Sequence, residues 1–328
     1  MDLSICIPTY QRNDQLAELL AGLSHVAPPG DGLRVRVLVI DNNPGGDARA
    51  VVEAAAASPG PYPISYIHET RPGVVHVRNR ALDANRQADF LVFIDDDELP
   101  TTGWLTALWS VWKQSEAAAV FGPVRAVYGA DAPAWLVSAA LHDCPVDETM
   151  DRTHPGFTNN CLIHLPTVRA HGLAFDPAMS LTGGEDILFF DGLLQRGERL
   201  ANAQNAWLTE KVPPSRATTE WLKRRWRREG ATDALLFHRR RGQGTGRIRA
   251  AAQAIPRIAI GGGMTALAWL LSGARMSDRV AKGLFTFQRG RGMLDFAFDR
   301  RVEEYARPAG PAASQAAGTG TDGASVHG

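Results

Sequence analysis

The segment FLVFIDDDELP, residues 90–100, decides the fold class of this chain. Five apolar residues, 90–94, predict a buried strand, and four carboxylates, Asp95 to Glu98, follow directly where it ends. In open α/β sheets, ligands gather outside the carboxyl ends of the strands. Adjacent carboxylates at such an edge repel one another and lose solvation, and a bound divalent cation relieves both costs. A solvated acidic turn that caps the next helix is the alternative interpretation.

Apolar runs of strand length alternate with helical patterns on both sides of this segment. Strands are expected at 3–8, 35–40, 64–68, 90–94, 118–124 and 160–164, and helices at 14–23, 47–57, 74–86, 101–115 and 186–195. This alternation is typical of an α/β fold in which helices flank a mainly parallel, doubly wound sheet.

The last third of the chain is helical and has a different composition. Residues 220–241 form a basic helical stretch, and the run 258–274 carries no charge. That run is short for a membrane span and contains three consecutive glycines, so we expect a helix that is buried or lies in a membrane interface. Small residues and proline dominate the end of the chain and predict disorder there. The expected divisions are an α/β domain at 1–230, a helical extension at 231–306 and a disordered tail at 307–328.

The charge of the chain is balanced as a whole but unevenly distributed. Lys and Arg together number 35, as do Asp and Glu, which argues against a chain-wide binder of nucleic acid. The net charge is −11 over residues 1–215, +9 over 216–257 and +2 over 258–328. A basic segment thus follows an acidic body, which indicates an anionic ligand or surface near residues 216–257.

Cysteine content and the N-terminal sequence indicate a reducing compartment. Three cysteines without a C-x-x-C spacing argue against a disulfide framework and a thiolate zinc site. The chain begins in a predicted strand and lacks the charged and apolar regions of a secretion signal. We therefore expect a cytoplasmic protein, with peripheral contact to the inner face of the cell membrane through its apolar segment.

A second segment with candidate chemistry is SLTGGEDILFFDGLLQRG, residues 180–197. Gly183 and Gly184 permit a tight turn, and Glu185 and Asp186 open the helix that follows. A helix dipole by itself favours carboxylates in a first turn. In an active site, the same position suits a general base that takes a proton from an attacking hydroxyl.

Six segments in a fixed order carry a family resemblance. They are SICIPTYQR at 4–12, VLVIDNN at 37–43, RPGVVHVRNRALDA at 71–84, FIDDDELP at 93–100, FTNNCLI at 157–163 and GGEDILFF at 183–190. Their order over roughly residues 1–230 resembles the family 2 inverting glycosyltransferases with the GT-A fold, of the kind that builds bacterial polysaccharides and lipopolysaccharides. The resemblance implies that a sugar moves with inversion from a nucleoside-diphosphate sugar to a hydroxyl of a glycan or lipid-linked acceptor, with Mn²⁺ or Mg²⁺ as cofactor.

The resemblance also implies the catalytic, metal-binding and donor-binding residues. Asp186 matches the family's catalytic base and Glu185 its neighbour, and Asp97 would ligate the metal together with Asp95. The expected nucleotide-sugar site consists of Pro8, Thr9, Tyr10, Asp41, Arg78, Asp95, Asp96, Arg225 and Trp226.

Two further assignments concern the acceptor and the pyrophosphate. Asn159 and Asn160 are expected on the acceptor side. Arg224, Arg225 and Trp226 resemble an Arg-Trp element and would contact the pyrophosphate through charge and stacking. A solvated basic helix face, or one that touches anionic lipid, is the alternative for this stretch.

Two other functions stay open at this point. A sugar-phosphate nucleotidyltransferase would share a related sheet, but it should carry a glycine-rich basic loop after the first strand, where this chain has PTYQRND. A non-catalytic scaffold at the membrane surface would use the basic segment and the apolar run. Its weakness is that Asp95, Asp97 and Asp186 would then have no role.

Overall fold

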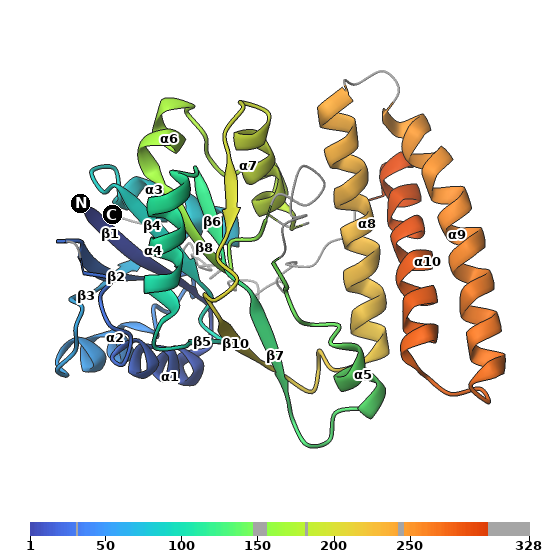
Figure 1. Cartoon of the computed structure of the whole chain (residues 1–328), viewed down its shortest axis with the longest axis horizontal. Helices are drawn as coiled ribbons and strands as arrows, with labels where there is room; N and C mark the ends of the chain where they lie inside the picture. The colour runs from blue at the N-terminus through green and yellow to red at the C-terminus, as the bar shows by residue number, and fades with distance from the viewer. Residues whose placement is uncertain (31, 147–155, 181–182, 242–245, 301–328) are drawn as a thin grey trace, which may run out of the picture.

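An α/β unit and a layer of three long helices make up the structure, a computed structural model that describes residues 1–30, 32–146, 156–180, 183–241 and 246–300. Figure 1 shows the sheet with helices on both faces and the three helices side by side next to it. The expected disordered tail at 307–328 lies outside the described residues.

A seven-stranded sheet forms the centre of the α/β unit, in the order β3-β2-β1-β4-β8-β6-β9. Its strands are β1 Asp2–Thr9, β2 Arg34–Asp41, β3 Ile64–His68, β4 Phe90–Ile94, β6 Ala119–Phe121, β8 Asn160–His164 and β9 Leu200–Asn202. Only β8 runs against its neighbours in this sheet. The chain builds outward from β1 to β3 and then returns to place β4 on the other side of β1, so the topological switch point lies between β1 and β4.

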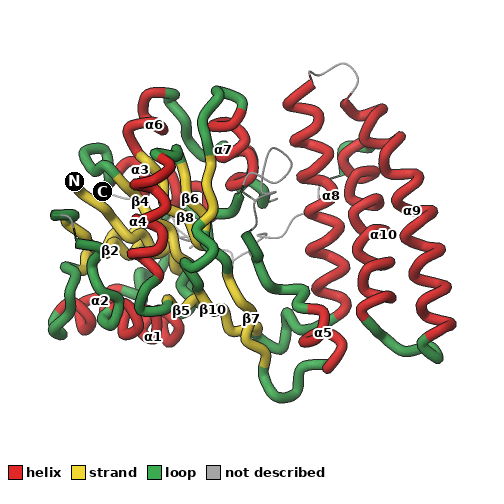
Figure 2. Tube along the Cα trace, in the orientation of Figure 1, coloured by secondary structure: helices red, strands yellow, loops and turns green. Residues whose placement is uncertain are grey.

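Helices cover both faces of the sheet, as Figure 2 shows. On one face lie α1 Asn13–Leu23, α2 Arg49–Ala56 and α4 Trp104–Ser115; on the other lie α3 Val74–Ala84, α6 Leu165–Ala170 and α7 Glu185–Leu194. Phe90, Val92 and Ile94 of β4 enter the first core, and Leu91 and Phe93 enter the second. Burial on both faces explains the uninterrupted apolar run of this strand. The predicted doubly wound α/β class is therefore confirmed.

The expected strand at 118–124 is divided between two sheets. It ends as β6 at Phe121, and after Gly122 and Pro123 the chain continues as β7 Val124–Tyr128 in a three-stranded sheet with β5 Glu98–Pro100 and β10 Leu208–Val212. Proline cannot donate a ladder hydrogen bond, which favours a break at this point. Two shorter helices, α5 Ala134–Ala139 and the 3₁₀ turn η1 Pro177–Met179, complete the α/β unit.

The three long helices are α8 Thr219–Arg241, α9 Gly246–Leu271 and α10 Asp278–Ala297. In Figure 1, α10 lies between α8 and α9, and α8 faces the sheet. Ion pairs Arg227–Asp295 and Arg289–Asp233 join α8 to α10. The expected domain boundary at 230/231 falls inside α8, which runs through it without interruption.

Two glycines let α8 and α10 approach closely. A Cβ atom at Gly230 would meet the carbonyl oxygen of Arg289, and one at Gly292 would meet the carbonyl oxygen of Arg227. The two backbones therefore touch at these positions, and no side chain fits between them.

Asn160 holds together four parts of the α/β unit, which leads to a stability prediction. Its Nδ2 donates to the carbonyl oxygens of Pro123 and Ala206, and its Oδ1 accepts from Trp104 Nε1. Asn160→Ala should lower the free energy of unfolding by about 2–4 kcal/mol, because three buried polar groups lose their partner. Urea denaturation measures the change, and the exposed neighbour variant Gln204→Ala is the control. A loss of less than about 1 kcal/mol would contradict the structural role given to Asn160.

Candidate active site

The carboxylates that follow β4 lie at the topological switch point, and each has a different environment. Asp96 is almost fully buried, and its carboxylate accepts from Thr9 Oγ1 at 2.8 Å and from Arg12 Nη1 at 2.8 Å. Burial raises the pKa of Asp96, and the Arg12 guanidinium opposes that rise. Asp96 and Thr9 thus connect the ends of β4 and β1, and both side chains are already engaged within the protein.

Glu98 is buried and orients its neighbours. Its carboxylate accepts from the backbone N–H of Asp95 at 2.9 Å and from Asn159 Nδ2 at 3.0 Å. Burial raises the pKa of Glu98 well above its usual value, and the Asp95 carboxylate adds to the rise. The structure therefore places Asn159 beside the carboxylate cluster, where it fixes Glu98.

Asp97 lies between two arginines. Its Oδ2 is 2.7 Å from Arg12 Nη1 and 3.6 Å from Arg216 Nη1, and Arg216 also pairs with Glu210 of β10 at 3.0 Å. Arg216 belongs to the loop that leads from β10 to α8. The basic segment therefore does reach the acidic site, although through Arg216, a residue that the sequence patterns did not single out.

Asp95 has no such neutralising partner. Among the described residues, none forms a hydrogen bond or an ion pair with its side chain. Burial raises the pKa of Asp95 to about 7; the more distant Arg78 guanidinium opposes this rise, and the carboxylates of Asp97 and Asp96 add to it. An added cation would relieve both the desolvation of the Asp95 carboxylate and its repulsion by Asp96 and Asp97.

The turn before α7 brings the second predicted segment to the same region. Gly183 and Gly184 adopt φ values of 74° and 83°, a left-handed backbone that glycine enters without strain. Glu185 is buried and forms an ion pair with Arg78 of α3. Burial raises the pKa of Glu185, and Arg78 opposes the rise. Asp186 remains partly exposed, and its Oδ1 accepts from the backbone N–H of Ile187 at 2.8 Å.

Arg78 links the two acidic segments electrostatically, since its charge acts on both Asp95 and Glu185. The carboxylate segment 90–100 and the candidate general-base segment 180–197 are therefore both influenced by the same guanidinium. The predicted approach of Arg78 to the nucleotide would require it to serve a ligand in addition to Glu185.

Three of the residues predicted to contact ligand are buried and already have partners within the protein. Asp41 is 0% exposed, and its carboxylate accepts from two backbone N–H groups and Tyr66 Oη, so it shapes its own loop. The side-chain amide of Asn160 is already hydrogen-bonded to Trp104 and to the carbonyl oxygens of Pro123 and Ala206. Trp226 is 3% exposed and packs against Leu222 and Phe285, so it cannot stack on a donor. Sequence patterns identify such residue types but not whether they are buried.

The remaining predicted contacts lie at accessible positions. Pro8 is partly buried at the end of β1, and Tyr10 is 37% exposed in the turn that follows. Arg224 is exposed on α8. Arg225 lies 3.0 Å from Glu229 and its guanidinium stands over the Trp221 ring, so Trp221 rather than Trp226 offers the aromatic face near the basic segment.

A histidine platform supports the loop that carries Arg216. His142 stacks on Trp221 with 5.1 Å between ring centroids, lies 3.1 Å from Tyr128 Oη through Nδ1, and lies 3.2 Å from the Arg216 carbonyl oxygen through Nε2. A neutral imidazole that accepts from Tyr128 and donates to Arg216 satisfies both contacts. Burial lowers the pKa of His142 to about 4, and the charge of Arg225 adds to the decrease.

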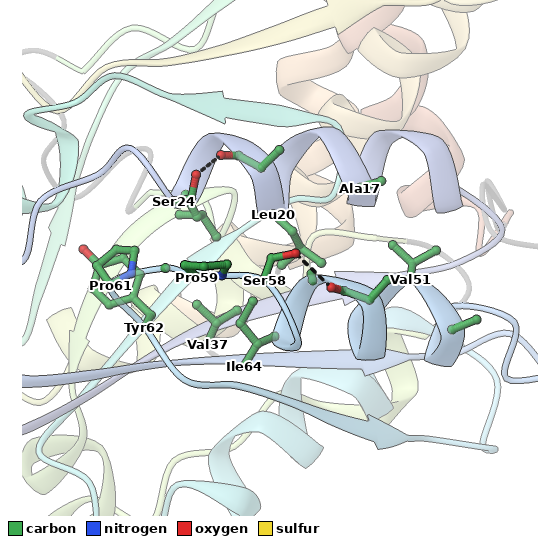
Figure 3. A pocket seen from close by; sticks show the side chains of 16 residues that line it. Ala17, Leu20, Ser24, Val37, Val51, Ser58, Pro59, Pro61, Tyr62 and Ile64 are labelled. Carbon is green, nitrogen blue, oxygen red and sulfur yellow. Dashed lines mark hydrogen bonds between the residues drawn. The ribbon is translucent and has the colours of Figure 1, made fainter.

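Two cavities differ in their relation to the carboxylates. A cavity of about 670 Å³ lies between α1 and α2 and is lined mainly by apolar side chains, among them Leu20, Val51 and Ile64 (Figure 3). Ser24 and Ser58 in its wall donate to carbonyl groups of their own helices. This cavity lies near the start of β3, away from the carboxyl edge of the sheet. A second cavity, of about 420 Å³, is lined by Arg12 and Asp97 and adjoins the carboxylate cluster.

Comparison with known proteins defines the family. The family model for Glycosyl transferase family 2 matches residues 4–159. The succinoglycan biosynthesis protein ExoM of Rhizobium meliloti is 37% identical over 237 residues, which cover 72% of this chain and 75% of that protein. The chain therefore belongs to glycosyl transferase family 2, and it is a glycosyltransferase. This result sets aside the nucleotidyltransferase and the non-catalytic scaffold as alternatives.

Solved glycosyltransferase structures share the fold. The mannosyltransferase PcManGT of Pyrobaculum calidifontis, in complex with GDP-Man and Mn²⁺, matches with a TM-score of 0.60 at 19% identity and covers 91% of this chain and 88% of its own. TarS 1–349 of S. aureus, in complex with UDP-GlcNAc, matches with a TM-score of 0.51 at 16% identity, over 89% and 90% of the two chains. The predicted GT-A fold is thereby confirmed.

The histidine platform leads to a prediction on pH dependence. Because the folded pKa of His142, about 4, lies below its usual 6.5, the neutral form stabilises the fold above pH 6.5, and this contribution decreases as the pH falls towards 4. Between pH 7.5 and pH 5 the loss should be about 2 kcal/mol in the wild type and absent in His142→Gln. Urea denaturation at the two pH values measures it, with exposed His25→Gln as the control. Equal pH dependence in His142→Gln and wild type would contradict the buried neutral imidazole.

Proposed function

We propose that this glycosyltransferase moves a sugar, with inversion, from a nucleoside-diphosphate sugar to an acceptor hydroxyl, and that Asp97 and Asp95 bind a divalent cation. The observation that carries the proposal is the partly buried Asp95 carboxylate, whose side chain forms no hydrogen bond or ion pair with any described residue and which lies at the switch point of the sheet beside Asp97. Nucleotides bind at such switch points in open α/β sheets.

The donor groups at this point suit a hard divalent cation. Across the described residues, no group of three or more His, Cys, Asp or Glu side chains is arranged to hold a metal ion by itself. Mg²⁺ and Mn²⁺ commonly take one or two carboxylates and complete their coordination with substrate phosphates and water. Asp95 and Asp97 can supply those two carboxylates. When bound, the cation would offset the negative charge that develops on the departing diphosphate.

Arg12 and Arg216 give the site its own positive charge. Arg12 is fixed by Asp96, whereas Arg216 stands on a loop and pairs with Asp97 and Glu210 at the surface of the cluster. When the donor binds, a guanidinium at this position can leave its carboxylate partner and bind phosphate oxygens instead. It can do so because carboxylate and phosphate oxygens match the guanidinium fork in a similar way. We assign Arg216 to the diphosphate of the donor, with Arg225 and Trp221 behind it.

Asp186 is the general base in this proposal. It is partly exposed at the start of α7, whereas its neighbour Glu185 is buried against Arg78 and cannot face an acceptor. The acceptor oxygen forms a bond to the anomeric carbon as its proton passes to the Asp186 carboxylate. The bond between that carbon and the diphosphate breaks on the opposite face, and the nucleoside diphosphate leaves. Glu185 acts as a positioning residue, because it fixes Arg78 and the start of α7.

The biological setting follows from the relatives by analogy. ExoM is a succinoglycan biosynthesis protein, and the two solved neighbours are complexes with UDP-GlcNAc and with GDP-Man. We assign this chain to the synthesis of a polysaccharide or of another cell-surface glycan, with a glycan or lipid-linked acceptor and at the cytoplasmic side of the membrane. The long apolar helix α9 is compatible with that location.

The first test addresses the cation site. Asp97→Asn should abolish Mn²⁺ binding, as measured by electron paramagnetic resonance in the presence of UDP, GDP or TDP. Arg216→Gln should strengthen Mn²⁺ binding without nucleotide about two- to fivefold, because a competing cation is removed, and should weaken nucleoside-diphosphate binding. Arg86→Gln, which changes an exposed arginine in the loop before β4, is the matched control and should change neither. Unchanged Mn²⁺ affinity in Asp97→Asn would refute the proposed site.

The second test separates Asp186 from Glu185. Asp186→Asn should lower turnover about a hundred- to ten-thousand-fold and leave donor affinity unchanged. Glu185→Gln should lower the free energy of unfolding by about 3 kcal/mol, because Arg78 loses its buried counter-charge. Calorimetry with the nucleoside diphosphate that binds best, release of that diphosphate from its sugar, and urea denaturation give the three quantities. Normal turnover in Asp186→Asn would remove it as the base.

A further inference from the structure

In α9 the small side chains are buried and the large apolar side chains are exposed, which is the reverse of what is found in a helix of a water-soluble protein. Its buried positions hold small residues, namely Gly246, Ala250, Ala254, Gly261 and Ala268. Its large apolar side chains point outward: Ile255, Leu267 and Leu270 are 64%, 60% and 75% exposed. In soluble proteins a helix normally buries its large apolar side chains against the core. Only 11% of the most apolar stretch of α9 is buried. The structure therefore excludes the expected alternative that this segment is a buried helix.

Close packing against α10 explains this arrangement. A Cβ atom at Gly261 would collide with the backbone of Phe287, and one at Gly283 of α10 would meet Thr265. Small residues at a helix contact let two backbones approach, a pattern that is common where helices pack in lipid. The inner face of α9 therefore packs against α10 and, near its start, against α8. Its outer face of large side chains stays uncovered by any described residue.

The charges around this outer face favour an anionic partner. The helix α9 contains no Asp or Glu, and Arg247 and Arg249 are exposed in its first turn. At its other end, Arg275, Arg279 and Lys282 are exposed. Residues 246–300 contain nine Arg or Lys and three Asp or Glu. Apolar side chains flanked by basic ones are the combination that binds the interface of an anionic bilayer.

The packing of the bundle decides the orientation of α9 on such a surface. Ion pairs Arg227–Asp295 and Arg289–Asp233 fix α10 to α8, and α10 packs against α9. To cross a bilayer, α9 would have to leave α10 or take the charged α10 with it, since charged side chains are costly in the hydrocarbon core. A helix that lies flat keeps every one of these contacts.

We propose that the outer face of α9 docks onto the surface of an anionic lipid bilayer, with the helix axis parallel to the membrane plane. The apolar side chains enter the boundary between headgroups and acyl chains, and the flanking arginines and Lys282 contact anionic headgroups. In Figure 1, α8 and α10 separate this face from the sheet and its carboxylate cluster. Docking is therefore independent of the proposed catalysis and can be tested without any substrate.

The first experiment measures partition of the full chain onto vesicles by co-sedimentation. Binding should be strong on vesicles with phosphatidylglycerol, weak on pure phosphatidylcholine, and reduced by salt. The triple variant Ile255→Ser/Leu267→Ser/Leu270→Ser should bind at least about tenfold more weakly, because three exposed side chains lose their apolar contact with lipid. Val137→Ser, which changes an exposed apolar residue on α5, is the matched control and should bind as wild type. All three altered positions are exposed, and urea denaturation verifies that the fold is retained.

The second experiment measures orientation by the depth of fluorescent labels. Ile255→Cys and Leu270→Cys place probes fifteen residues apart on the same helix, about 22 Å along its axis. Quenching by lipids with nitroxides at known depths should give nearly the same shallow depth at both positions. Depths that differ by about 20 Å would show a spanning helix and overturn the proposed orientation.

Self-association through the same face is the competing outcome. A second copy of the chain on α9 would give a dimer in light scattering that dissociates in the triple variant, together with no vesicle binding. That result, or equal vesicle partition of wild type and triple variant, would overturn the proposal. Neither result would bear on Asp95, Asp97 or Asp186.

Discussion

The concentration of negative charge after β4 is the constraint on which the rest of the site depends. Four consecutive carboxylates, Asp95 to Glu98, stand at the end of a fully buried strand, where they repel one another and lack full hydration. The protein offsets this charge in two ways: Arg12 and Arg216 pair with Asp96 and Asp97, and hydrogen-bond donors satisfy Glu98. In the described part of the chain, the Asp95 side chain forms neither kind of contact. The loops after β1 and β10 and the position of Arg78 all serve this one region.

The sequence was a good guide to the fold wherever one face or both faces of an element are buried. The bounds of β3, β4 and β8 agree with the expectation, because apolar runs of strand length between turn residues have few alternatives. The expected strand at 118–124 spans two sheets, because its last residue, Val124, begins β7 and pairs with Leu208 of β10, 84 residues away in sequence. The boundary expected at residue 230 lies within α8, which continues through it as one helix.

For the active site, the sequence identified the acidic segments but not the environment of each residue. Asp41, Asn160 and Trp226 have the chemistry of ligand-binding residues, yet tertiary contacts bury all three. Arg12, Glu210 and Arg216 are not among the site residues expected from the sequence, and they become part of the site through the ends of β1 and β10. Glu185 and Asp186 are adjacent in sequence, and only the fold separates the buried ion-paired residue from the accessible one. Whether a site residue is buried or accessible depends on contacts between segments that lie far apart in sequence, and local sequence patterns contain no information on those contacts.

The glycine contacts of the helical layer have a consequence for which substitutions this part of the chain can accept over evolutionary time. At Gly230 and Gly292 the smallest possible addition, one methyl group, collides with backbone, so drift at these two positions is restricted to residues that lack a Cβ atom. The outer positions of α9 face no neighbour in the described chain and accept almost any side chain without loss of the fold. In this layer, therefore, the positions that tolerate substitution carry large apolar side chains. In most proteins such side chains mark positions that are important for the fold. Any persistence of Ile, Leu and Trp on that outer face across related sequences would reflect selection for a surface and not for folding.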